Sequence, residues 1–421
     1  MQIFAAYFLG FLSLLMAGLL FLRIKAPLGF MIWFPKLAAG ALSPLWCILG
    51  ICAAVLGRLA RAPLAAAAGS IGAAALTWYI WMVTRTGKGF EQAFGRDWPR
   101  RISPQQSAPM LQRRWVGILQ DPRGAEARLE KDLVFWRFPE ADDRALLADL
   151  WQPPEGVAPS GLALIFLHGS AWYMLDKDYG TRPFFRHLTA QGHVVMDVAY
   201  RLCPEVDIYG MLGDVKRAVA WMKAHAAQYR VNPERILLGG ASAGGHLSML
   251  AAYAPHHPDL TPSELKGIDL SVRGVVSYYG PSDLRAVYAH TNQQRLVGLP
   301  RVPIGRASAD QSSKKMRDAG RLDILLGGHP SEVPAAYALA SPICRIHPGC
   351  PPTLLIQGAH DLITPLAATE AAYRELVKAG VPAVNVVFPC TDHGFDLLLP
   401  RISPTAQSAL YEVERFMALL I

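Results

Sequence analysis

Long apolar runs without a charge dominate the start of the chain. Three such windows cover residues 1–22, 37–57 and 62–84. Each is close to the ~20 residues that an α-helix needs to cross the core of a bilayer. The pattern therefore predicts three transmembrane helices, over about 3–22, 37–57 and 63–84, within a membrane region of residues 1–85. A cleaved signal peptide is the alternative for the first window, but that window has no basic start and runs straight into further apolar segments.

The pattern changes after this region. Residues 86–127 are rich in Arg, Gln and Pro and have no clear period, which is typical of a juxtamembrane connector lying against anionic headgroups. Apolar and polar residues then alternate, so two antiparallel strands are expected at 133–138 and 145–151.

Apolar runs of strand length, separated by helical segments, fill the rest of the chain. Strands are expected at 161–167, 193–200, 235–240, 272–279, 352–357 and 383–388, and helices at about 179–191, 208–228, 365–379 and from 405 onward. This alternation predicts an α/β fold over residues 128–421, with a mostly parallel sheet and helices on both faces. Residues 284–340 interrupt it, as either a lid over a site or a solvated surface excursion.

The charges divide the chain in the same way. The formal net charge is +8. Residues 1–85 contain no acidic residue, and their basic residues are Arg23, Lys25, Lys36, Arg58, Arg61 and Arg85. Because this excess lies at the ends of apolar segments, we expect no nucleic-acid partner. The Lys and Arg bias favours a multi-pass integral membrane protein with an outside N-terminus and a cytoplasmic globular domain.

The cysteines point to no cofactor. None of the six lies in a C-x-x-C or Cys/His spacing typical of a structural zinc site. Cys344 and Cys350 flank a Pro-Gly turn and could pair in an oxidising compartment, but free buried thiols fit the expected topology better. We expect neither a metal nor an organic cofactor.

A serine in a glycine-bracketed turn is the strongest chemical signal. Gly240-Ala-Ser-Ala-Gly244 fits G-x-S-x-G between an expected strand and an expected helix. Ser242 would sit on a sharp turn, where side chains at positions 240 and 244 would collide with neighbouring backbone. The turn also places Ser242 at a helix N-terminus, which favours developing negative charge. Ser242 is therefore the candidate nucleophile.

Two later strand ends supply the base and the acid that a serine nucleophile needs. Asp361 follows the strand at 352–357, and His393 follows the last strand. Open α/β sheets place their sites at such carboxyl ends. The order Ser, Asp, His is that of α/β-hydrolases. We expect His393 to act as general base and then acid, and Asp361 to orient it.

Other acids are weaker candidates. Asp392 adjoins His393 in sequence, and neighbouring side chains diverge. Asp283 is expected to cap a turn and Asp396 to cap a helix or loop. Three histidines are not expected to replace His393: His168, His246 and His360.

A tetrahedral intermediate also needs preorganised hydrogen-bond donors for its oxyanion. The backbone N–H of Ala243, directly after the nucleophile, is one candidate. The loop after the first parallel strand should supply the other, and its residues Gly169 and Ser170 lie at the expected place.

Four segments carry a resemblance to a known family. His168-Gly-Ser-Ala-Trp172 looks like the oxyanion motif H-G-G-x-W, and Ser242-Ala-Gly-Gly-His-Leu247 like the serine turn, of the hormone-sensitive-lipase/carboxylesterase and BD-FAE branch of α/β-hydrolases. Tyr200–Glu205 and Pro352–Asp361 resemble its Y-R-L-A-P-E segment and acid-bearing strand. The resemblance covers residues 128–421 and implies the α/β-hydrolase fold. One departure is Ser170, where the motif has its second glycine; this side chain could add a donor or narrow the pocket.

Together these features predict a membrane-anchored serine hydrolase that cleaves carboxylic esters through an acyl-enzyme. The expected partners are an apolar small-molecule ester and a lipid membrane. The resemblance also reaches prenylcysteine methylesterases and arylformamidases, so a methylesterase, an amidase or formamidase, and an acyltransferase remain alternatives on the same site. A catalytically silent binding module is the alternative from another class.

Overall fold

An eight-stranded sheet forms the centre of the protein. The computed structural model describes residues 1–23, 28–85, 87, 89–120, 126–138, 144–293 and 321–421. In chain order the strands are β1 (Arg128–Phe138), β2 (Arg144–Gln152), β3 (Ala163–Leu167), β4 (Val194–Ala199), β5 (Ile236–Ala241), β6 (Gly274–Tyr278), β7 (Thr353–Gly358) and β8 (Ala383–Phe388). Their order in the sheet is β1-β2-β4-β3-β5-β6-β7-β8. The β1–β2 and β2–β4 pairs are antiparallel and the others are parallel, so the prediction of a mostly parallel sheet is confirmed.

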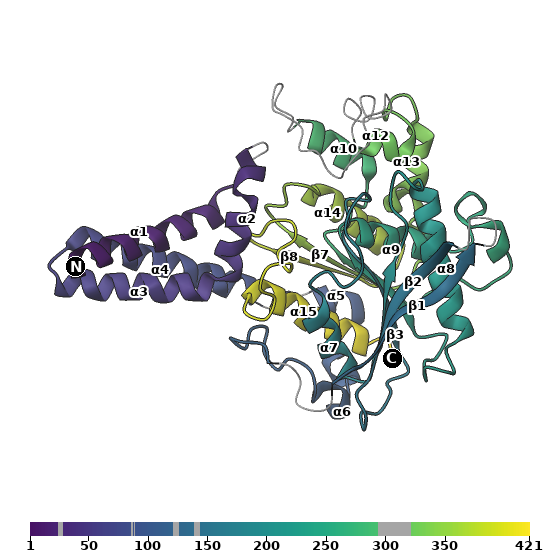
Figure 1. Ribbon diagram of the computed structural model, residues 1–421, viewed down its shortest axis with the longest axis horizontal. Coiled ribbons are helices and arrows are strands. Elements are labelled where there is room, and N and C mark those ends of the chain that lie inside the picture. The colour runs from purple at the N-terminus through teal and green to yellow at the C-terminus, as the bar shows by residue number, and fades with distance from the viewer. Residues whose placement is uncertain (24–27, 86, 88, 121–125, 139–143, 294–320) are drawn as a thin grey trace.

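Helices cover both faces of this sheet (Figure 1). One face packs against α8 (Ile208–Ala224), α9 (Ala243–Tyr253) and α14 (Leu366–Lys378), and the other against α7 (Arg182–Thr189) and α15 (Pro404–Ala418). Alternate residues of a strand belong to the two cores: Ile165 faces the first group and Leu164 the second. Because the central strands are buried on both faces, their sequences read as continuous apolar runs.

Three helices extend away from the sheet as a long projection, here called the helical prong (Figure 1). They are α1 (Gln2–Phe21), α3 (Ser43–Leu59) and α4 (Pro63–Val83). The N-terminus lies at the free end of the prong. A further helix, α2 (Leu28–Ala41), lies at the base of the prong, next to the domain built around the sheet.

The prong helices agree in part with the expected transmembrane segments. The helices α1 and α4 are each long and apolar enough to span a membrane, and α2 with α3 forms a third candidate if this pair is one span. The single helix expected over 37–57 is wrong, because the chain bends by 76° between α2 and α3. Pro44 lies in the first turn of α3, where its missing N–H is tolerated; its ring would clash with a continued α2.

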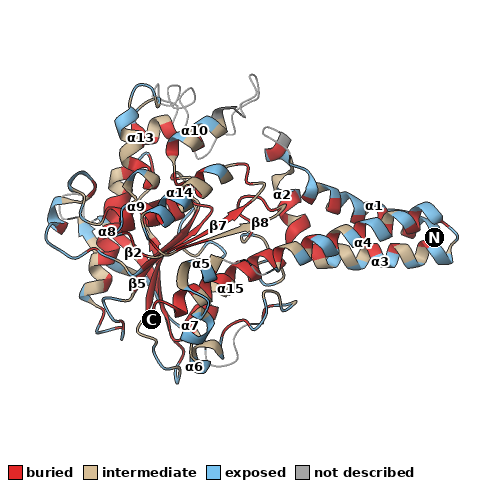
Figure 2. Ribbon diagram, turned by 180° about the vertical axis from the view of Figure 1, so that it is seen from behind, coloured by how far each residue is buried: buried red, intermediate tan, exposed pale blue. Residues whose placement is uncertain are grey.

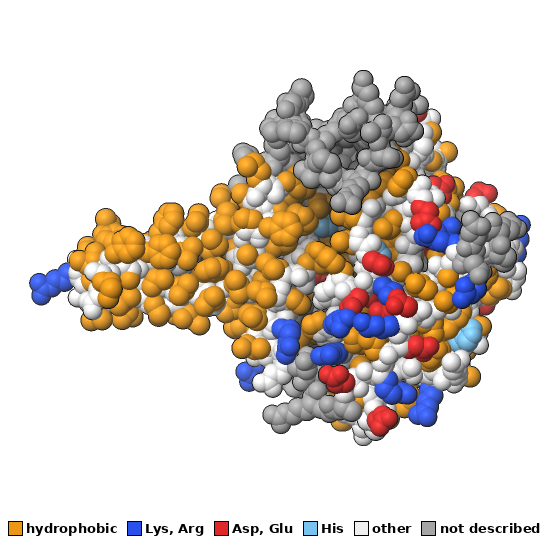
Figure 3. Space-filling model, viewed as in Figure 1, with side chains coloured by type: hydrophobic (Ala, Val, Ile, Leu, Met, Phe, Trp, Pro, Cys, Tyr) orange, Lys and Arg blue, Asp and Glu red, His pale blue; other side chains and the backbone are white. Residues whose placement is uncertain are grey.

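The prong has small residues inside and large ones outside. Its buried positions include Gly50, Gly69 and Gly72. A Cβ atom added to Gly69 would lie 2.5 Å from the carbonyl oxygen of Gly50, so the two backbones are almost in contact. Large apolar side chains are exposed around the outside, among them Phe4, Phe11, Ile48, Ile51 and Ile71. Figure 2 shows the exposed outer surface of these helices, and Figure 3 shows that apolar side chains cover it.

The connecting segment between the prong and the sheet packs onto the domain. It contains α5 (Gly89–Phe94), a short 3-10 turn (Trp98–Arg101) and α6 (Pro104–Ser107). Phe90, Leu111 and Leu119 are buried in the core that also contains α15. The N–H of Leu111 donates to Glu414 at 3.0 Å.

Part of the expected insertion lies outside the described residues, namely 294–320. Its described flanks are α10 (Leu284–Gln293), α12 (Arg321–Leu326) and α13 (Pro334–Ala340). Leu325 and Tyr337 of these flanks are buried in the core beside α9. The lid and the surface excursion both remain predictions.

Candidate active site

Ser242 lies on a strained turn between β5 and α9. Its backbone angles are φ 52° and ψ −117°, a region that L-residues rarely adopt and that costs free energy. The two bracketing glycines make the turn sterically possible. A Cβ at Gly240 would lie 2.5 Å from the carbonyl oxygen of Leu167, and one at Gly244 would lie 2.0 Å from the same atom. No other residue type fits at either position without moving β3.

The structure brings the three expected catalytic side chains into one chain of hydrogen bonds. His393 Nε2 lies 3.0 Å from Ser242 Oγ, and His393 Nδ1 lies 2.8 Å from Asp361 Oδ2. The three residues follow β5, β7 and β8, at the carboxyl edge of the sheet. Asp361 and His393 are buried, whereas Ser242 is partly exposed. This arrangement can deprotonate the serine hydroxyl when an electrophile approaches it.

The Asp361 carboxylate is fixed by donors on both oxygens. Its Oδ1 accepts the N–H groups of Ile363 at 2.8 Å and Thr364 at 2.7 Å, and its Oδ2 accepts the side-chain amide of Gln357 at 2.7 Å. With an ionised carboxylate as acceptor, His393 carries its proton on Nδ1 and presents the lone pair of Nε2 to Ser242.

The competing acids lie elsewhere. Asp392 Oδ1 accepts the backbone N–H groups of Leu362 and His393, at 3.0 and 2.8 Å, and these are backbone contacts. Asp283 Oδ1 accepts the N–H of Arg285 at 2.9 Å, as expected for a residue that caps a turn. The expectation that Asp396 caps a helix or loop is wrong, because its carboxylate accepts the hydroxyl proton of Tyr279. Burial raises the pKa of Asp396, and the hydrogen bond from Tyr279 opposes this shift.

The other histidines have structural partners. His246 Nδ1 accepts the indole N–H of Trp172 at 3.3 Å, and its Nε2 lies 2.8 Å from the carbonyl oxygen of Ala340. The ring of His168 stacks on Tyr200 with 4.5 Å between centroids. Burial lowers the pKa of both histidines to about 4, so both are neutral at pH 7.

The candidate oxyanion loop faces the nucleophile. A Cβ added to Gly169 would lie 3.5 Å from Ser242 Cβ. The N–H of Ala243 is the first of α9, and at a helix start it has no acceptor within the helix. The Ser170 hydroxyl lies 2.7 Å from the Tyr200 hydroxyl and accepts the N–H of Trp172 at 2.9 Å. The Ser170 side chain is thus part of the loop's own bonding.

Two residues near the site were missed by the sequence interpretation. Trp33 Nε1 donates to the carbonyl oxygen of His393 at 2.8 Å, and Lys36 Nζ lies 3.2 Å from Asp392 Oδ2. Both belong to α2, and in the sequence they lie between the apolar windows 1–22 and 37–57, within the predicted membrane region 1–85. Nothing in a pattern of apolar residues indicates a contact with a loop 360 residues away. The signal available in the sequence was Lys36, a charged residue within an otherwise apolar stretch at 28–41.

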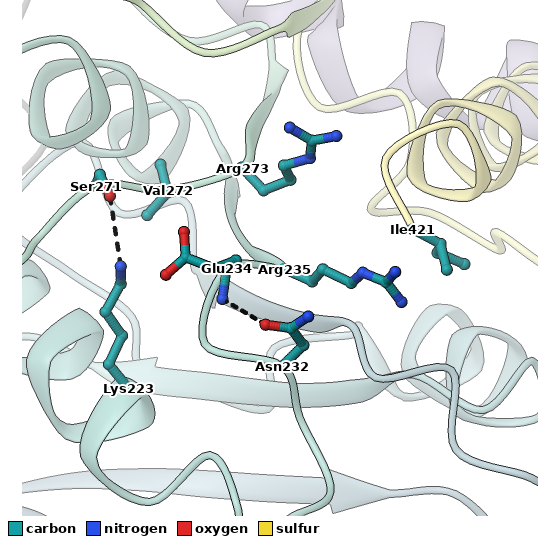
Figure 4. Close-up of a pocket in the computed structure, with 8 residues that line it drawn as sticks. All are labelled: Lys223, Asn232, Glu234, Arg235, Ser271, Val272, Arg273 and Ile421. Atoms are coloured by element: carbon teal, nitrogen blue, oxygen red, sulfur yellow. Dashed lines mark hydrogen bonds between the residues drawn. The ribbon is translucent and has the colours of Figure 1, made fainter.

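Figure 4 shows a separate open hollow that none of the catalytic candidates lines. Its volume is about 330 Å³, and its lining includes Lys223, Arg235, Arg273 and the last residue, Ile421. Arg235 and Arg273 directly precede β5 and β6, so this hollow lies at the amino edge of the sheet, opposite to Ser242.

Cysteines and metal ligands do not contribute to the site. All six cysteines are free; Cys203 and Cys350 are buried, whereas Cys344 is exposed. The prediction of buried thiols therefore holds for Cys203 and Cys350 and is wrong for Cys52 and Cys344. In the part of the chain that the structure describes, no group of three or more His, Cys, Asp or Glu could hold a metal ion.

The sheet order and the strand–turn–helix at Ser242 define an α/β-hydrolase. The BD-FAE family model matches residues 148–376, more than half of the chain. The chain therefore belongs to the BD-FAE family, within the hormone-sensitive-lipase-like carboxylesterase branch of α/β-hydrolases.

Curated relatives and solved structures agree with this assignment. The chain is 30% identical to the probable carboxylic ester hydrolase LipM of Mycobacterium tuberculosis, over 65% of this chain and 58% of LipM. It is 28% identical to esterase LipC of the same organism, over 74% of this chain and 68% of LipC. The native structure of esterase Est2 from Thermogutta terrifontis superposes with a TM-score of 0.51 at 24% identity, over 72% of this chain and 95% of Est2. That likeness shows the fold alone.

Proposed function

We propose that this protein is a membrane-anchored serine hydrolase that cleaves carboxylic esters of small molecules. The hydrogen-bonded chain from Ser242 through His393 to Asp361, on a strained turn, carries the proposal. A binding module needs neither the strain nor the chain of bonds. The names of LipM and LipC support the ester class, although the alignment spans only 58% of LipM.

The proposed reaction follows from the positions of the protons. Ser242 Oγ attacks the ester carbonyl carbon while His393 Nε2 takes the hydroxyl proton, and Asp361 stabilises the resulting imidazolium. The oxyanion accepts hydrogen bonds from the backbone N–H of Ala243 and from the loop at Gly169 and Ser170. His393 returns the proton to the leaving alcohol. Water then attacks the acyl carbon while His393 Nε2 takes one of its protons. The carboxylic acid product leaves as His393 returns that proton to Ser242 Oγ.

The anchor is proposed from the construction of the prong. In a bilayer there is no hydrophobic force between helices, so membrane helices pack through small residues and turn large apolar ones toward lipid. The prong has this arrangement, with Gly50, Gly69 and Gly72 inside and phenylalanine, leucine and isoleucine outside. The 20 residues of α1 and the 21 of α4 each span about 30 Å at 1.5 Å per residue, the thickness of the hydrocarbon core.

The proposed topology has three crossings, by α1, α3 and α4. The N-terminus and the α3–α4 turn, with Arg58 and Arg61, lie on the far side of the membrane. The hydrolase domain lies on the side with the larger number of Lys and Arg residues, which is the cytoplasmic side. A site beside a membrane favours apolar esters that partition into lipid.

A fluorophosphonate probe tests the chemistry. Detergent-solubilised protein should be labelled at Ser242 and should hydrolyse p-nitrophenyl esters, with a chain-length profile that defines the acyl preference. Well-folded protein that resists the probe would contradict the proposal. Added alcohol or amine distinguishes an acyltransferase, because the acyl group would then pass to the added nucleophile faster than to water. The same assay with anilide and formamide substrates separates an amidase or formamidase.

Extraction and proteolysis test the anchor. The full chain should stay with membranes after an alkaline carbonate wash. Trypsin should digest the hydrolase domain in inside-out vesicles and leave it intact in sealed right-side-out vesicles. Release by carbonate would contradict the anchor, and the opposite digestion pattern would reverse the topology.

A further inference from the structure

Helix α2 is in direct contact with the loop that carries His393. The indole N–H of Trp33 donates to the carbonyl oxygen of His393 itself, at 2.8 Å. The Trp33 ring also lies near the imidazole, with 6.4 Å between centroids, and a Cβ added to the next residue, Gly394, would lie 3.5 Å from it. A strong backbone acceptor on the histidine is thus satisfied by a residue from the membrane region.

One turn further along α2, Lys36 reaches the same loop. Its Nζ lies 3.2 Å from Asp392 Oδ2, and the two side chains are only 4% and 5% exposed. The same nitrogen lies 3.2 Å from His360 Nδ1, beside Asp361 in the chain. Each charge of a buried pair needs the other, since removal of one leaves an uncompensated charge out of water.

Asp392 joins the acid loop to the base loop. Its Oδ1 accepts the N–H of Leu362, next to Asp361, and the N–H of His393. Its other oxygen faces Lys36. A change in the ionic state or position of Asp392 therefore moves the backbone on both sides of the 2.8 Å bond between His393 and Asp361.

The junction between α2 and this loop is tightly closed. The crevice there has a volume of only about 10 Å³ and is lined by residues of both parts, including Lys36, Tyr79 and Asp392. Tyr79 of α4 adds a 2.8 Å hydrogen bond to Thr405 at the start of α15. Close-packed contacts transmit small displacements, so a shift of α2 can pass to the His393 loop.

On the basis of the proposed hydrolase function, we propose that Trp33 and Lys36 are positioning residues of the active site. The Trp33 indole fixes the His393 peptide, and Lys36 holds Asp392 in the geometry that ties the two loops together. Neither side chain touches the reacting atoms. The helix next to the membrane is therefore a working part of the catalytic site as well as a connection to the prong.

Trp33→Phe is the first test, because it removes the N–H donor and keeps an aromatic ring. A histidine displaced by a fraction of an ångström loses its alignment with Ser242, so kcat per labelled site should fall on the order of 10-fold with KM nearly unchanged. Fluorophosphonate titration counts competent sites and separates this effect from loss of folded protein. Trp221→Phe is the matched control: Trp221 lies on α8 close to Lys223, at the amino edge of the sheet, where its ring stacks on His225, and the variant should retain wild-type kcat.

Lys36→Met and Lys36→Met/Asp392→Asn form the second test. The single change leaves the Asp392 charge buried without its cation, and kcat should fall on the order of 10-fold or more. In the double variant both charges are gone, while the Asn oxygen can still accept the two N–H groups, so most of the lost kcat should return. Met31→Ala, at a position on α2 that is 73% exposed, should have no effect.

The outcomes separate the two levels of the proposal. Wild-type kcat per site in both Trp33→Phe and Lys36→Met would overturn the positioning role and leave the hydrolase function intact. A fall only in the number of labelled sites, with normal kcat per site, would also overturn it, since that is a folding effect. Failure of the wild-type protein to react with the probe would instead contradict the proposed function.

Discussion

The hydroxyl groups of Ser170 and Tyr200 lie 2.7 Å apart, and a count of their protons fixes the role of Ser170. Tyr200 has one hydroxyl proton, and it donates that proton to the carbonyl oxygen of His168 at 2.8 Å. Ser170 must therefore donate its own proton to Tyr200 while it accepts the N–H of Trp172. No hydroxyl proton is left for an oxyanion. Ser170 braces a loop in which Ala171 and Trp172 both have positive φ.

Ser170→Ala and Tyr200→Phe test this brace. Each change removes part of one network, so each should reduce kcat/KM by about 10-fold through a loosened oxyanion loop. Because the two residues act together, kcat/KM of the double variant should be no lower than that of the less active single variant. Steady-state kinetics on p-nitrophenyl esters measure this. Strictly additive losses would mean that Ser170 and Tyr200 act independently.

The strained backbone at Ser242 should lower the stability of the folded protein, because the turn serves catalysis. Its φ of 52° and ψ of −117° suit glycine far better than a residue with a Cβ. Ser242→Gly should therefore be more stable than Ser242→Ala by about 1–3 kcal/mol, although both should lose nearly all turnover. Thermal unfolding of the two variants in the same detergent provides the comparison. Equal stability would mean that the turn is not strained in solution.

The two neighbouring acids should differ sharply. Asp361 bonds the His393 ring, so Asp361→Asn should lower kcat by about 10⁴-fold, as expected when the histidine loses its orienting carboxylate. Among the described residues, Asp392 bonds backbone N–H groups and Lys36. Asp392→Asn can keep the N–H bonds but leaves the buried Lys36 without its counter-charge, so it should cost about 10-fold. Both numbers are kcat per fluorophosphonate-labelled site. The reverse ranking would transfer the orienting role to Asp392.

The central sheet could be predicted because its strands are buried on both faces, which leaves an unbroken apolar run such as 163–167 between polar turns. The positions of Ser242, Asp361 and His393 were predicted to converge, because parallel strands end at one edge of the sheet. Other features depend on long-range packing. The break at the start of α3 was hidden in one apolar window, and Asp396 was assigned to a cap because its partner Tyr279 follows the distant strand β6. The contact of α2 with His393 is invisible to any local pattern for the same reason.

His246 should make the protein sensitive to mild acid. The Trp172 indole N–H donates to its Nδ1, and the ring lies fully buried behind the oxyanion loop. Burial lowers the pKa of His246 to about 4, from an ordinary value of 6.5, although the Ala340 carbonyl opposes this shift. The stabilising contribution is therefore present above pH 6.5 and is lost as the pH falls toward 4, because the unfolded state binds a proton that the folded state excludes.

His246→Gln isolates this contribution. The amide of glutamine can accept from the indole and donate to a carbonyl, as neutral imidazole does, but it does not titrate. Between pH 7 and pH 5 the wild type should lose about 2 kcal/mol more stability than the variant. Asp197, whose pKa is raised to about 7 by burial, acts in the opposite direction, but it is present in both proteins and cancels. Thermal unfolding at the two pH values checks the difference, and parallel curves for the two proteins would mean that His246 is protonated as readily in the folded state as in the unfolded chain.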